Sequence, residues 1–204
     1  MKDFWNTRYA SDNYVYGTAP NSFFKSALEE FQIEGSILLP AEGEGRNAVY
    51  AAIQGLEVSA FDISIEGQKK ALLLAQENNV QINYAVGGLE NQHYEKESFD
   101  AAALIFAHFP SLLRSQYHKK IAQLIKPAGH IIIEGFEKEH GKYQKENPNV
   151  GGPKNIELLL SITELKNDFS DFDFLLSEEK VITLDEGQFH QGEGKVVRLV
   201  GVKK

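Results

Sequence analysis

Two glycines flanked by acidic residues are the part of the sequence with the clearest chemical meaning. An apolar run ends in Glu42, Gly43 and Gly45, and a second apolar run ends in Asp62. Glycines at this spacing allow the backbone to turn sharply and to approach a ligand closely, and the helix that follows presents free N–H groups. A carboxylate at the end of the next strand can accept both hydroxyl groups of a ribose. The pattern therefore predicts a site for a nucleotide-like cofactor at the carboxyl edge of a parallel sheet.

The acidic residues indicate which kind of cofactor this is. Glu42 and Glu44 flank Gly43, and two carboxylates would repel a pyrophosphate but suit S-adenosylmethionine, which carries an amino group and a sulfonium. Charge-assisted hydrogen bonds of this kind contribute roughly 1.5–3 kcal/mol each. The same residues also fit the loose G-x-G-x-x-[GA] pattern of NAD(P)- and flavin-dependent oxidoreductases, which is weak on its own. Three alternatives remain. The protein could be an oxidoreductase, or it could bind S-adenosylmethionine without transferring its methyl group. The carboxylates could also only cap loops.

Strand-like and helix-like segments alternate around these residues, as parallel sheets with covered faces require. Residues 126–129 (Lys-Pro-Ala-Gly) are expected to separate the last of these helices from the strand that follows. The strand-like segments are 37–41, 57–62, 81–86, 99–107 and 130–136, and the helix-like segments between them are 46–54, 64–78 and 111–125.

The two ends of the chain differ from this pattern. Residues 2–10 are expected to form a short helix, and Asn21 caps a second helix. A long polar loop at 137–155 precedes an amphipathic helix at 156–169. The final strand-like segments, 172–184 and 195–202, leave no room for a helix between them and should pair antiparallel. We expect one domain over 1–204, with a helical lid segment at 1–34 and a Rossmann-like core at 35–204.

Composition excludes several classes of function. The absence of cysteine excludes disulfides, thiolate metal sites and a cysteine nucleophile. A net charge of −8 with scattered Lys and Arg residues argues against a nucleic-acid partner. The six histidines lack metal-binding spacing, so no metal site is expected. No secretory signal or membrane-spanning run is visible, which favours a cytoplasmic protein whose oligomeric state is left open.

With these residues in view, the chain resembles the class I S-adenosylmethionine-dependent methyltransferases, and within them a small bacterial group similar to tellurite-resistance methyltransferases. The similarity extends over nearly the whole chain in the expected order. The matching residues are Trp5, Arg8 and Tyr9; Tyr14 to Pro20; Ala41 to Asn47; Phe61 to Ser64; Phe106 to Pro110 with Arg114; Leu124 to Gly129; Gly151 to Lys154; and Glu186, Gly187, His190 and Gly192.

The resemblance implies a three-layer, Rossmann-like methyltransferase fold. Its sheet has seven strands and is mostly parallel, with a C-terminal antiparallel strand pair. It also implies that Glu42, Gly43 and Gly45 contact the methionine moiety of S-adenosylmethionine and that Asp62 binds the ribose. Ile63 should pack on the adenine.

The chain departs from the family pattern at one position. Family members often carry an acidic residue at the end of the third strand, whereas this chain has Gly88, so backbone groups of Gly88 and Leu89 would have to contact the adenine. Phe106, near the end of the fourth strand-like segment, is a further expected cofactor contact.

The methyl acceptor is predicted mainly by exclusion. Cytosine C5 methylation normally needs a cysteine nucleophile, and the Asn/Asp-Pro-Pro-aromatic motif of amino-methylating DNA enzymes is absent. A small molecule remains, with a thiol, an amine or a metalloid oxyanion as its accepting group. His108 is a candidate base, Glu134 a candidate pocket residue, and Arg46 a candidate partner for an anion, as is Arg114. His108 could equally close its strand, and Arg46 could bond only to local groups.

The aromatic residues near the start of the chain have two interpretations. Tyr16 with Gly17 favours a lid over the cofactor that excludes water, whereas Trp5 and Tyr9 are expected to belong to the core. The loop 137–155 is a second candidate cover, with its double glycine as a hinge, or else a surface loop. His190 is expected only to organise the last hairpin.

Overall fold

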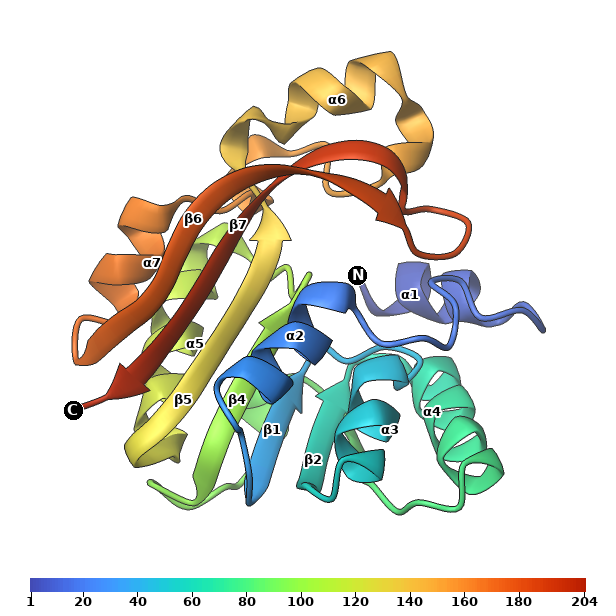
Figure 1. Cartoon of the computed structure of the whole chain (residues 1–204). Helices are drawn as coiled ribbons and strands as arrows, with labels where there is room; N and C mark the ends of the chain where they lie inside the picture. Colours follow the sequence, from blue (N-terminus) through green and yellow to red (C-terminus); the bar gives the residue numbers. More distant parts are fainter.

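The structure is a computed structural model that describes all residues, 1–204, and it is built on one seven-stranded sheet (Figure 1). The strand order is β3-β2-β1-β4-β5-β7-β6. The first five strands are parallel, and β7 runs antiparallel to both β5 and β6. This confirms the predicted mostly parallel sheet with a C-terminal antiparallel pair. The strands are β1 (Ser36–Pro40), β2 (Glu57–Asp62), β3 (Asn83–Val86), β4 (Phe99–Ile105), β5 (Ile125–Phe136), β6 (Phe172–Asp185) and β7 (Gln191–Lys203).

Helices cover both faces of the sheet (Figure 1). One buried cluster joins α2 and α3 to β1, β2 and β4, and a larger one joins α5 and α7 to the other face. Next to α3 lies α4, and α1 packs on α4. The helices are α1 (Lys2–Tyr9), α2 (Ser22–Glu30), α3 (Arg46–Ile53), α4 (Ile65–Glu77), α5 (Ser111–Leu124), α6 (Gly141–Glu146) and α7 (Ile162–Asp168). The short 3-10 helices are η1 (Leu89–Asn91), η2 (Lys138–His140), η3 (Pro148–Val150) and η4 (Ile156–Leu158).

Side-chain caps set where several helices begin. The Asn21 side chain accepts a hydrogen bond from Phe24 N at 2.8 Å, which starts α2 as the sequence predicts. The Ser64 hydroxyl accepts from Gly67 N at 3.1 Å and starts α4 at the end of β2. Both helices therefore begin near the carboxyl edge of the sheet, where the predicted cofactor residues lie.

Three sequence predictions need correction. Residues 126–129 do not separate α5 from β5, because β5 begins at Ile125 and these residues bulge out where the register with β4 shifts. The segment 137–155 is not an open loop, because it contains α6 and two 3-10 turns. The helix expected at 156–169 is split into η4 and α7, because Ser161 caps α7 and Leu160 N bonds to Phe136 O at 2.8 Å.

The hairpin of β6 and β7 brings the end of the chain to its beginning. It bends over the upper edge of the sheet, and its connection, 186–190, lies beside α1 (Figure 1). Gln188 N donates to Val15 O at 2.9 Å, and the Arg8 guanidinium lies 4.3 Å from the centre of the Phe189 ring. Segments from both ends of the chain therefore meet above the carboxyl ends of the parallel strands.

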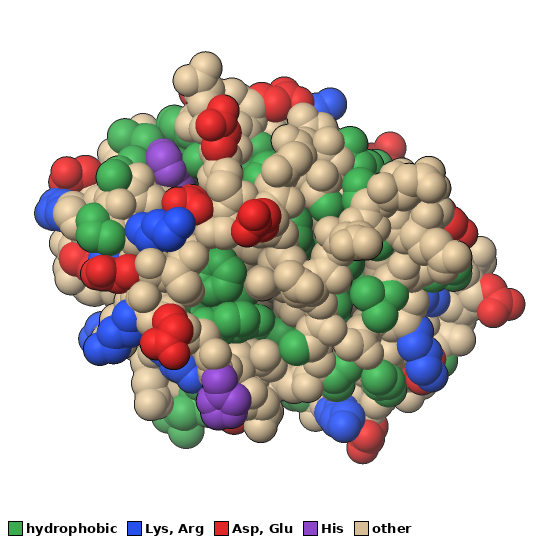
Figure 2. Space-filling model, turned by 90° about the horizontal axis from the view of Figure 1, so that it is seen from below, with side chains coloured by type: hydrophobic (Ala, Val, Ile, Leu, Met, Phe, Trp, Pro, Cys, Tyr) green, Lys and Arg blue, Asp and Glu red, His purple; other side chains and the backbone are tan.

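None of the helices combines the length and the apolar character that crossing a membrane requires. Figure 2 shows the molecule from below, at the amino ends of the parallel strands. On this face Lys and Arg side chains are interspersed with Asp and Glu side chains, so positive charge does not gather there.

Candidate active site

A cavity of about 640 Å³ opens at the carboxyl ends of the parallel strands. Its wall contains residues from both ends of the chain as well as from the strand ends, and 16 of its 29 residues are hydrophobic. Gly43 and Gly45 are not among the wall residues. The wall does include the other predicted cofactor residues, Tyr16, Glu42, Asp62, Ile63, Gly88, Leu89 and Phe106.

The two glycines allow other parts of the chain to approach the turn. Gly43 has φ +65°, and a Cβ on it would lie 2.7 Å from the Tyr9 hydroxyl of α1. Gly45 has φ +88°, and a Cβ on it would lie 2.7 Å from the Cα atom of Ala71 in α4. Both positions therefore require glycine for backbone conformation and for packing. The glycines hold α1 and α4 against the turn, behind the cavity wall.

Glu42 links the cavity to the first turn of α3. Its Oε1 atom accepts hydrogen bonds from Asn47 N at 2.9 Å and Ala48 N at 2.7 Å. Burial raises the pKa of Glu42 to about 7, although these backbone bonds and the nearby Arg46 act in the opposite direction. The carboxyl group thus caps a helix while it lines the cavity.

Asp62 fixes the geometry between β2 and the glycine turn. Its Oδ2 atom accepts from Gly43 N at 3.2 Å, and its Oδ1 atom accepts from Ser64 N at 2.8 Å. Burial raises the pKa of Asp62, and these backbone bonds limit the rise. Two carboxylate oxygens offer about four lone-pair sites, so the two backbone bonds leave capacity for further donors.

An acidic residue lies at the end of β3 after all. A Cβ on Gly88 would clash with the carboxylate of Glu90, so that carboxylate fills the space where a side chain at position 88 would be. Glu90 lines the cavity, and its Oε2 atom accepts from the Tyr117 hydroxyl at 2.9 Å. Sequence reasoning missed Glu90, although an acidic residue two positions after the expected one was a usable signal.

His108 lies on the cavity wall and has an unpaired nitrogen. Its Nδ1 atom is buried without a hydrogen-bond partner. Burial lowers the pKa of His108 to about 4, although a hydrogen bond to the Leu158 backbone acts against this. The imidazole is therefore neutral at pH 7.

The prediction that Glu134 lines the cavity is wrong. Glu134 is 1% exposed and lies off the wall, where it accepts from Arg198 Nε at 2.7 Å and Asn21 Nδ2 at 3.2 Å. Burial raises its pKa, although Arg198 and Asn21 oppose the rise. The physical reason is strand length: β5 continues two residues beyond Glu134, and Phe136 at its end reaches the wall instead.

The two arginines predicted to hold an anion are already paired. Arg46 lines the cavity, but its Nη2 atom lies 2.9 Å from Glu186 Oε2 and its Nη1 atom donates to Tyr16 O at 3.3 Å. Arg114 lies off the wall and bonds Glu164 at 3.2 Å, as well as two backbone carbonyls. Both charges are therefore already neutralised within the protein.

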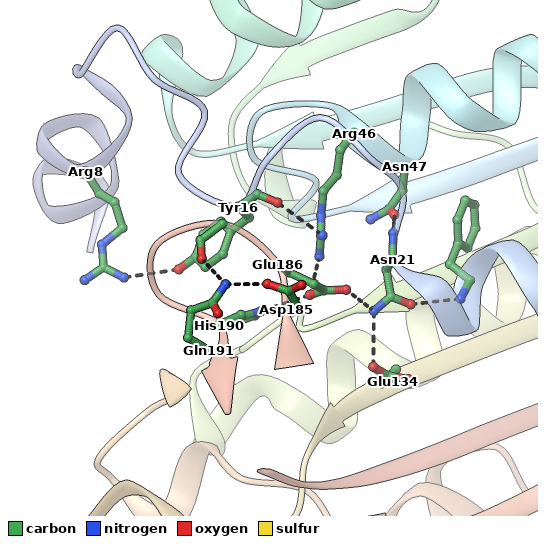
Figure 3. A network of polar contacts seen from close by, with 12 residues as sticks. Arg8, Tyr16, Asn21, Arg46, Asn47, Glu134, Asp185, Glu186, His190 and Gln191 are labelled. Atoms are coloured by element: carbon green, nitrogen blue, oxygen red, sulfur yellow. Dashed lines mark hydrogen bonds and ion pairs between the residues drawn. The ribbon is translucent and has the colours of Figure 1, made fainter. Parts of the chain in front are cut away.

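His190 and Glu186 extend the site from the β6–β7 connection (Figure 3). His190 lines the cavity, and its Nδ1 atom lies 3.0 Å from Glu186 Oε2. Burial alone would raise the pKa of Glu186, but its interactions with His190 and Arg46 outweigh burial and lower it to about 2. The Asn21 side chain bridges Glu186 and Glu134. The Glu186-Gly187-x-x-His190 motif was visible in the sequence, but its place at the cavity was not.

The first helix forms one side of the cavity. Trp5 lines the wall instead of the core, which corrects the sequence prediction, and Tyr9 is buried yet also reaches the wall. Arg8 donates to the Tyr16 hydroxyl at 3.1 Å and lies 4.7 Å from the centre of the Phe4 ring. No carboxylate lies within 4.0 Å of Arg8. It is thus the only Lys or Arg side chain on the wall without an acidic partner.

Comparisons with known proteins agree with this geometry. Residues 37–129 match the family model described as a methyltransferase domain. No curated protein matches the chain in sequence. A solved structure of TehB from Haemophilus influenzae is 17% identical, with a TM-score of 0.71 over 100% of this chain and 67% of that one.

Two further solved structures are similar over nearly their whole length. Magnesium protoporphyrin IX methyltransferase from Synechocystis, with bound SAH, is 15% identical and covers 100% of this chain and 98% of that one, with a TM-score of 0.72. The other structure is described by the conversion of a disulfide bond into a thioacetal group during echinomycin biosynthesis, and it is 15% identical. The match covers 100% of this chain and 92% of that one, with a TM-score of 0.79. At these identities the likeness shows a shared fold.

Proposed function

We propose that the chain, whose residues 37–129 match the methyltransferase domain, is a class I S-adenosylmethionine-dependent methyltransferase, and that it methylates a small molecule bound beside the donor in the cavity described above. The observation that carries this proposal is the placement of Glu42 and Asp62 on one wall of a cavity that is large enough for two ligands. We further propose that residues 1–204 act as one domain, in which the segment 1–34 supplies one side of the cavity.

The wall residues fit the chemical groups of the donor. Asp62 has the remaining acceptor capacity for the ribose hydroxyls, and Glu42 is placed for the cationic amino acid end. Ile63 and Leu89 supply apolar surface for the adenine. We propose that Glu90, above Gly88, accepts the hydrogen bond of the adenine amino group.

The donor also carries a carboxylate, which needs a positive partner. Arg8 is the wall cation without an acidic partner, and it belongs to the same helix as Tyr9, whose hydroxyl touches the glycine turn. We therefore propose that Arg8 binds the carboxylate of the methionine moiety. The carboxylates and the cation of the wall then match the charges of the donor.

The remaining task of the protein is alignment and exclusion of water. S-adenosylmethionine supplies an electrophilic methyl group on a sulfonium, and an in-line displacement needs a nucleophile held opposite the departing sulfur. Aromatic residues around the cavity, among them Trp5, Phe106 and Phe136, exclude water from that line. We propose that His108 accepts the proton that leaves the acceptor through Nε2, because Nδ1 is buried.

The nature of the acceptor follows from charge and composition. The net charge of −8 disfavours a nucleic acid, and the size of the cavity suits a small molecule. The similar structure from echinomycin biosynthesis belongs to the conversion of a disulfide bond into a thioacetal group, and this supports a sulfur acceptor here. We propose sulfur or oxygen as the accepting atom.

Calorimetry tests the proposed function directly. The protein should bind one S-adenosylmethionine or one S-adenosylhomocysteine per chain, and it should not bind NAD⁺. Binding of NAD⁺ without binding of either sulfur ligand would contradict the assignment of this cavity. Transfer of an isotopically labelled methyl group to an added acceptor then measures the reaction itself.

The role of Arg8 predicts a selective loss of affinity. Arg8→Ala should weaken S-adenosylmethionine binding about tenfold, because one charge-assisted bond is lost. Decarboxylated S-adenosylmethionine should bind the variant and the original protein equally, since it has no carboxylate for Arg8. Tyr16→Phe is the matched control, because it removes the partner of Arg8 but keeps the charge. Equal losses for both ligands would show that Arg8 acts only through packing.

A further inference from the structure

We infer that the methyl acceptor is an electrically neutral, largely apolar molecule that presents one S–H or O–H group to His108, and that inorganic oxyanions and carboxylates are poor acceptors. This inference rests on the proposed function and specifies its substrate class. It concerns the acceptor wall, which we define as His108, Phe136, Gly152, Pro153, Leu158 and His190.

The acceptor wall consists mainly of apolar and aromatic surface. The Phe136 ring is fully buried behind this surface, with the His190 ring 5.4 Å away and nearly perpendicular and the His108 ring 6.1 Å away and nearly parallel. Leu158 and Pro153 complete it from the segment after α6. A ligand that buries apolar area here gains about 25 cal/mol per Å², whereas a buried ion without a partner is strongly disfavoured.

The acceptor wall itself contains no Lys or Arg side chain that could compensate an anionic acceptor. Arg46 is paired with Glu186 at 2.9 Å, and Arg114 is paired with Glu164 at 3.2 Å and lies off the wall. Arg8 is the remaining Lys or Arg side chain of the cavity wall, and we have assigned it to the carboxylate of the donor. An oxyanion or carboxylate on the acceptor wall would therefore lie in an apolar environment without a counter-charge.

The histidines of this region do not supply that charge either. Burial lowers the pKa of His108, and burial also lowers the pKa of His190, although Glu186 acts against the shift. His140, which stacks on Phe136 at 4.0 Å, has a pKa lowered by burial as well. All three rings are neutral at neutral pH, so the region recognises hydrogen bonds and shape.

The accessible ring nitrogen of His108 specifies what the acceptor must offer. Nδ1 is buried without a hydrogen-bond partner, so a ligand in the cavity can reach only Nε2. With the hydrogen on Nδ1, Nε2 carries a lone pair and accepts. An S–H or O–H group on the ligand provides a donor for that lone pair.

The chemical step balances with these groups alone. The acceptor sulfur or oxygen forms a bond to the methyl carbon while the bond between that carbon and the sulfonium sulfur breaks, and its electron pair stays on that sulfur. The proton of the S–H or O–H group passes to His108 Nε2. Because burial disfavours the charged imidazole, the proton then leaves to solvent with the products.

Two thiols that differ by one carboxylate test the inference. Phenylmethanethiol and 4-(mercaptomethyl)benzoate keep the same ring and the same protonated thiol at pH 7. Calorimetry on the complex with S-adenosylhomocysteine should show the neutral thiol binding about tenfold or more tightly, and labelled methyl transfer should show the same preference. Tighter binding of the carboxylate, or binding of neither thiol, overturns the inference.

An introduced cation should reverse the preference. Leu158→Arg places a charge on the acceptor wall and should improve binding of 4-(mercaptomethyl)benzoate relative to phenylmethanethiol about tenfold. Ile156→Arg is the matched control, since Ile156 lies in the same 3-10 helix, is 56% exposed and is not on the wall. If both variants shift the preference between the two thiols equally, the added charge attracts the carboxylate from any position, and the inference fails. If the unmodified protein does not bind S-adenosylhomocysteine, the proposed function is refuted. This outcome is distinguishable from a failure of the inference about the acceptor.

Discussion

Replacing Asp62 with asparagine should weaken S-adenosylmethionine binding about a hundredfold while the protein stays folded. Asp62 lies at the end of β2 on the cavity wall, where we propose that it accepts both ribose hydroxyls. Its carboxylate already accepts from Gly43 N and Ser64 N. The amide of the variant would keep the shape of the side chain and one oxygen that accepts hydrogen bonds. Its NH₂ group, however, would face another hydrogen-bond donor. Calorimetry with S-adenosylmethionine and S-adenosylhomocysteine measures the loss, and thermal unfolding verifies that the fold persists.

Asp100→Asn is the matched control for this experiment. Asp100 lies at the amino end of β4, at the opposite edge of the sheet, and it also accepts from a backbone group, Ser36 N at 2.8 Å. Its substitution should lower stability without changing the affinity for either ligand. If the Asp100 variant loses affinity as strongly as the Asp62 variant, or if the Asp62 variant keeps full affinity, the ribose role of Asp62 is refuted.

Glu186→Gln should remove much of the acid sensitivity of the fold. Burial alone would raise the pKa of Glu186, but His190 and Arg46 lower it to about 2, against an ordinary value of 4.5. A carboxylate with a lowered pKa in the folded state contributes stability above pH 4.5, and this contribution is lost as the pH falls towards 2. The amount is on the order of 3 kcal/mol. Urea unfolding at several pH values between 7 and 3 measures it.

The comparison with a neighbouring carboxylate makes this result specific. Asp185→Asn changes an exposed residue whose side chain accepts from Gln191 Nε2 at 2.9 Å. This variant should keep the slope of stability against pH, whereas Glu186→Gln should flatten it and lower stability at pH 7. An unchanged slope in the Glu186 variant would mean that its contacts with Arg46 and His190 do not stabilise the fold.

The donor half of the site could be predicted from the sequence because its residues follow local patterns. Glu42 and Asp62 end two apolar strands, and neighbouring parallel strands bring their carboxyl ends together whatever the rest of the chain does. The same rule failed for Glu134, because the sequence did not show how far β5 continues. A residue two positions further along a strand points to the same face of the sheet, but it lies past the edge of the sheet.

The acceptor half could not be predicted in the same way. Phe136, Leu158 and His190 come from a strand end, a 3-10 turn and a hairpin connection that no local pattern relates. Their convergence depends on the bend of β6 and β7 and on the capping of α7 by Ser161, which splits the expected helix. Such long-range packing is visible only in three dimensions.

The contact of the β6–β7 connection with the first residues of the chain also has a consequence for biosynthesis. Glu186 bonds Asn21 and Arg46, and Gln188 bonds Val15, so groups that meet in space are separated by most of the polypeptide. While the ribosome is still making the chain, the first five strands can pair, but the enclosure above them cannot exist until residue 190 has emerged. The parallel strands can therefore form during synthesis before the cavity is complete, and an incomplete product would have these strands without the complete cavity.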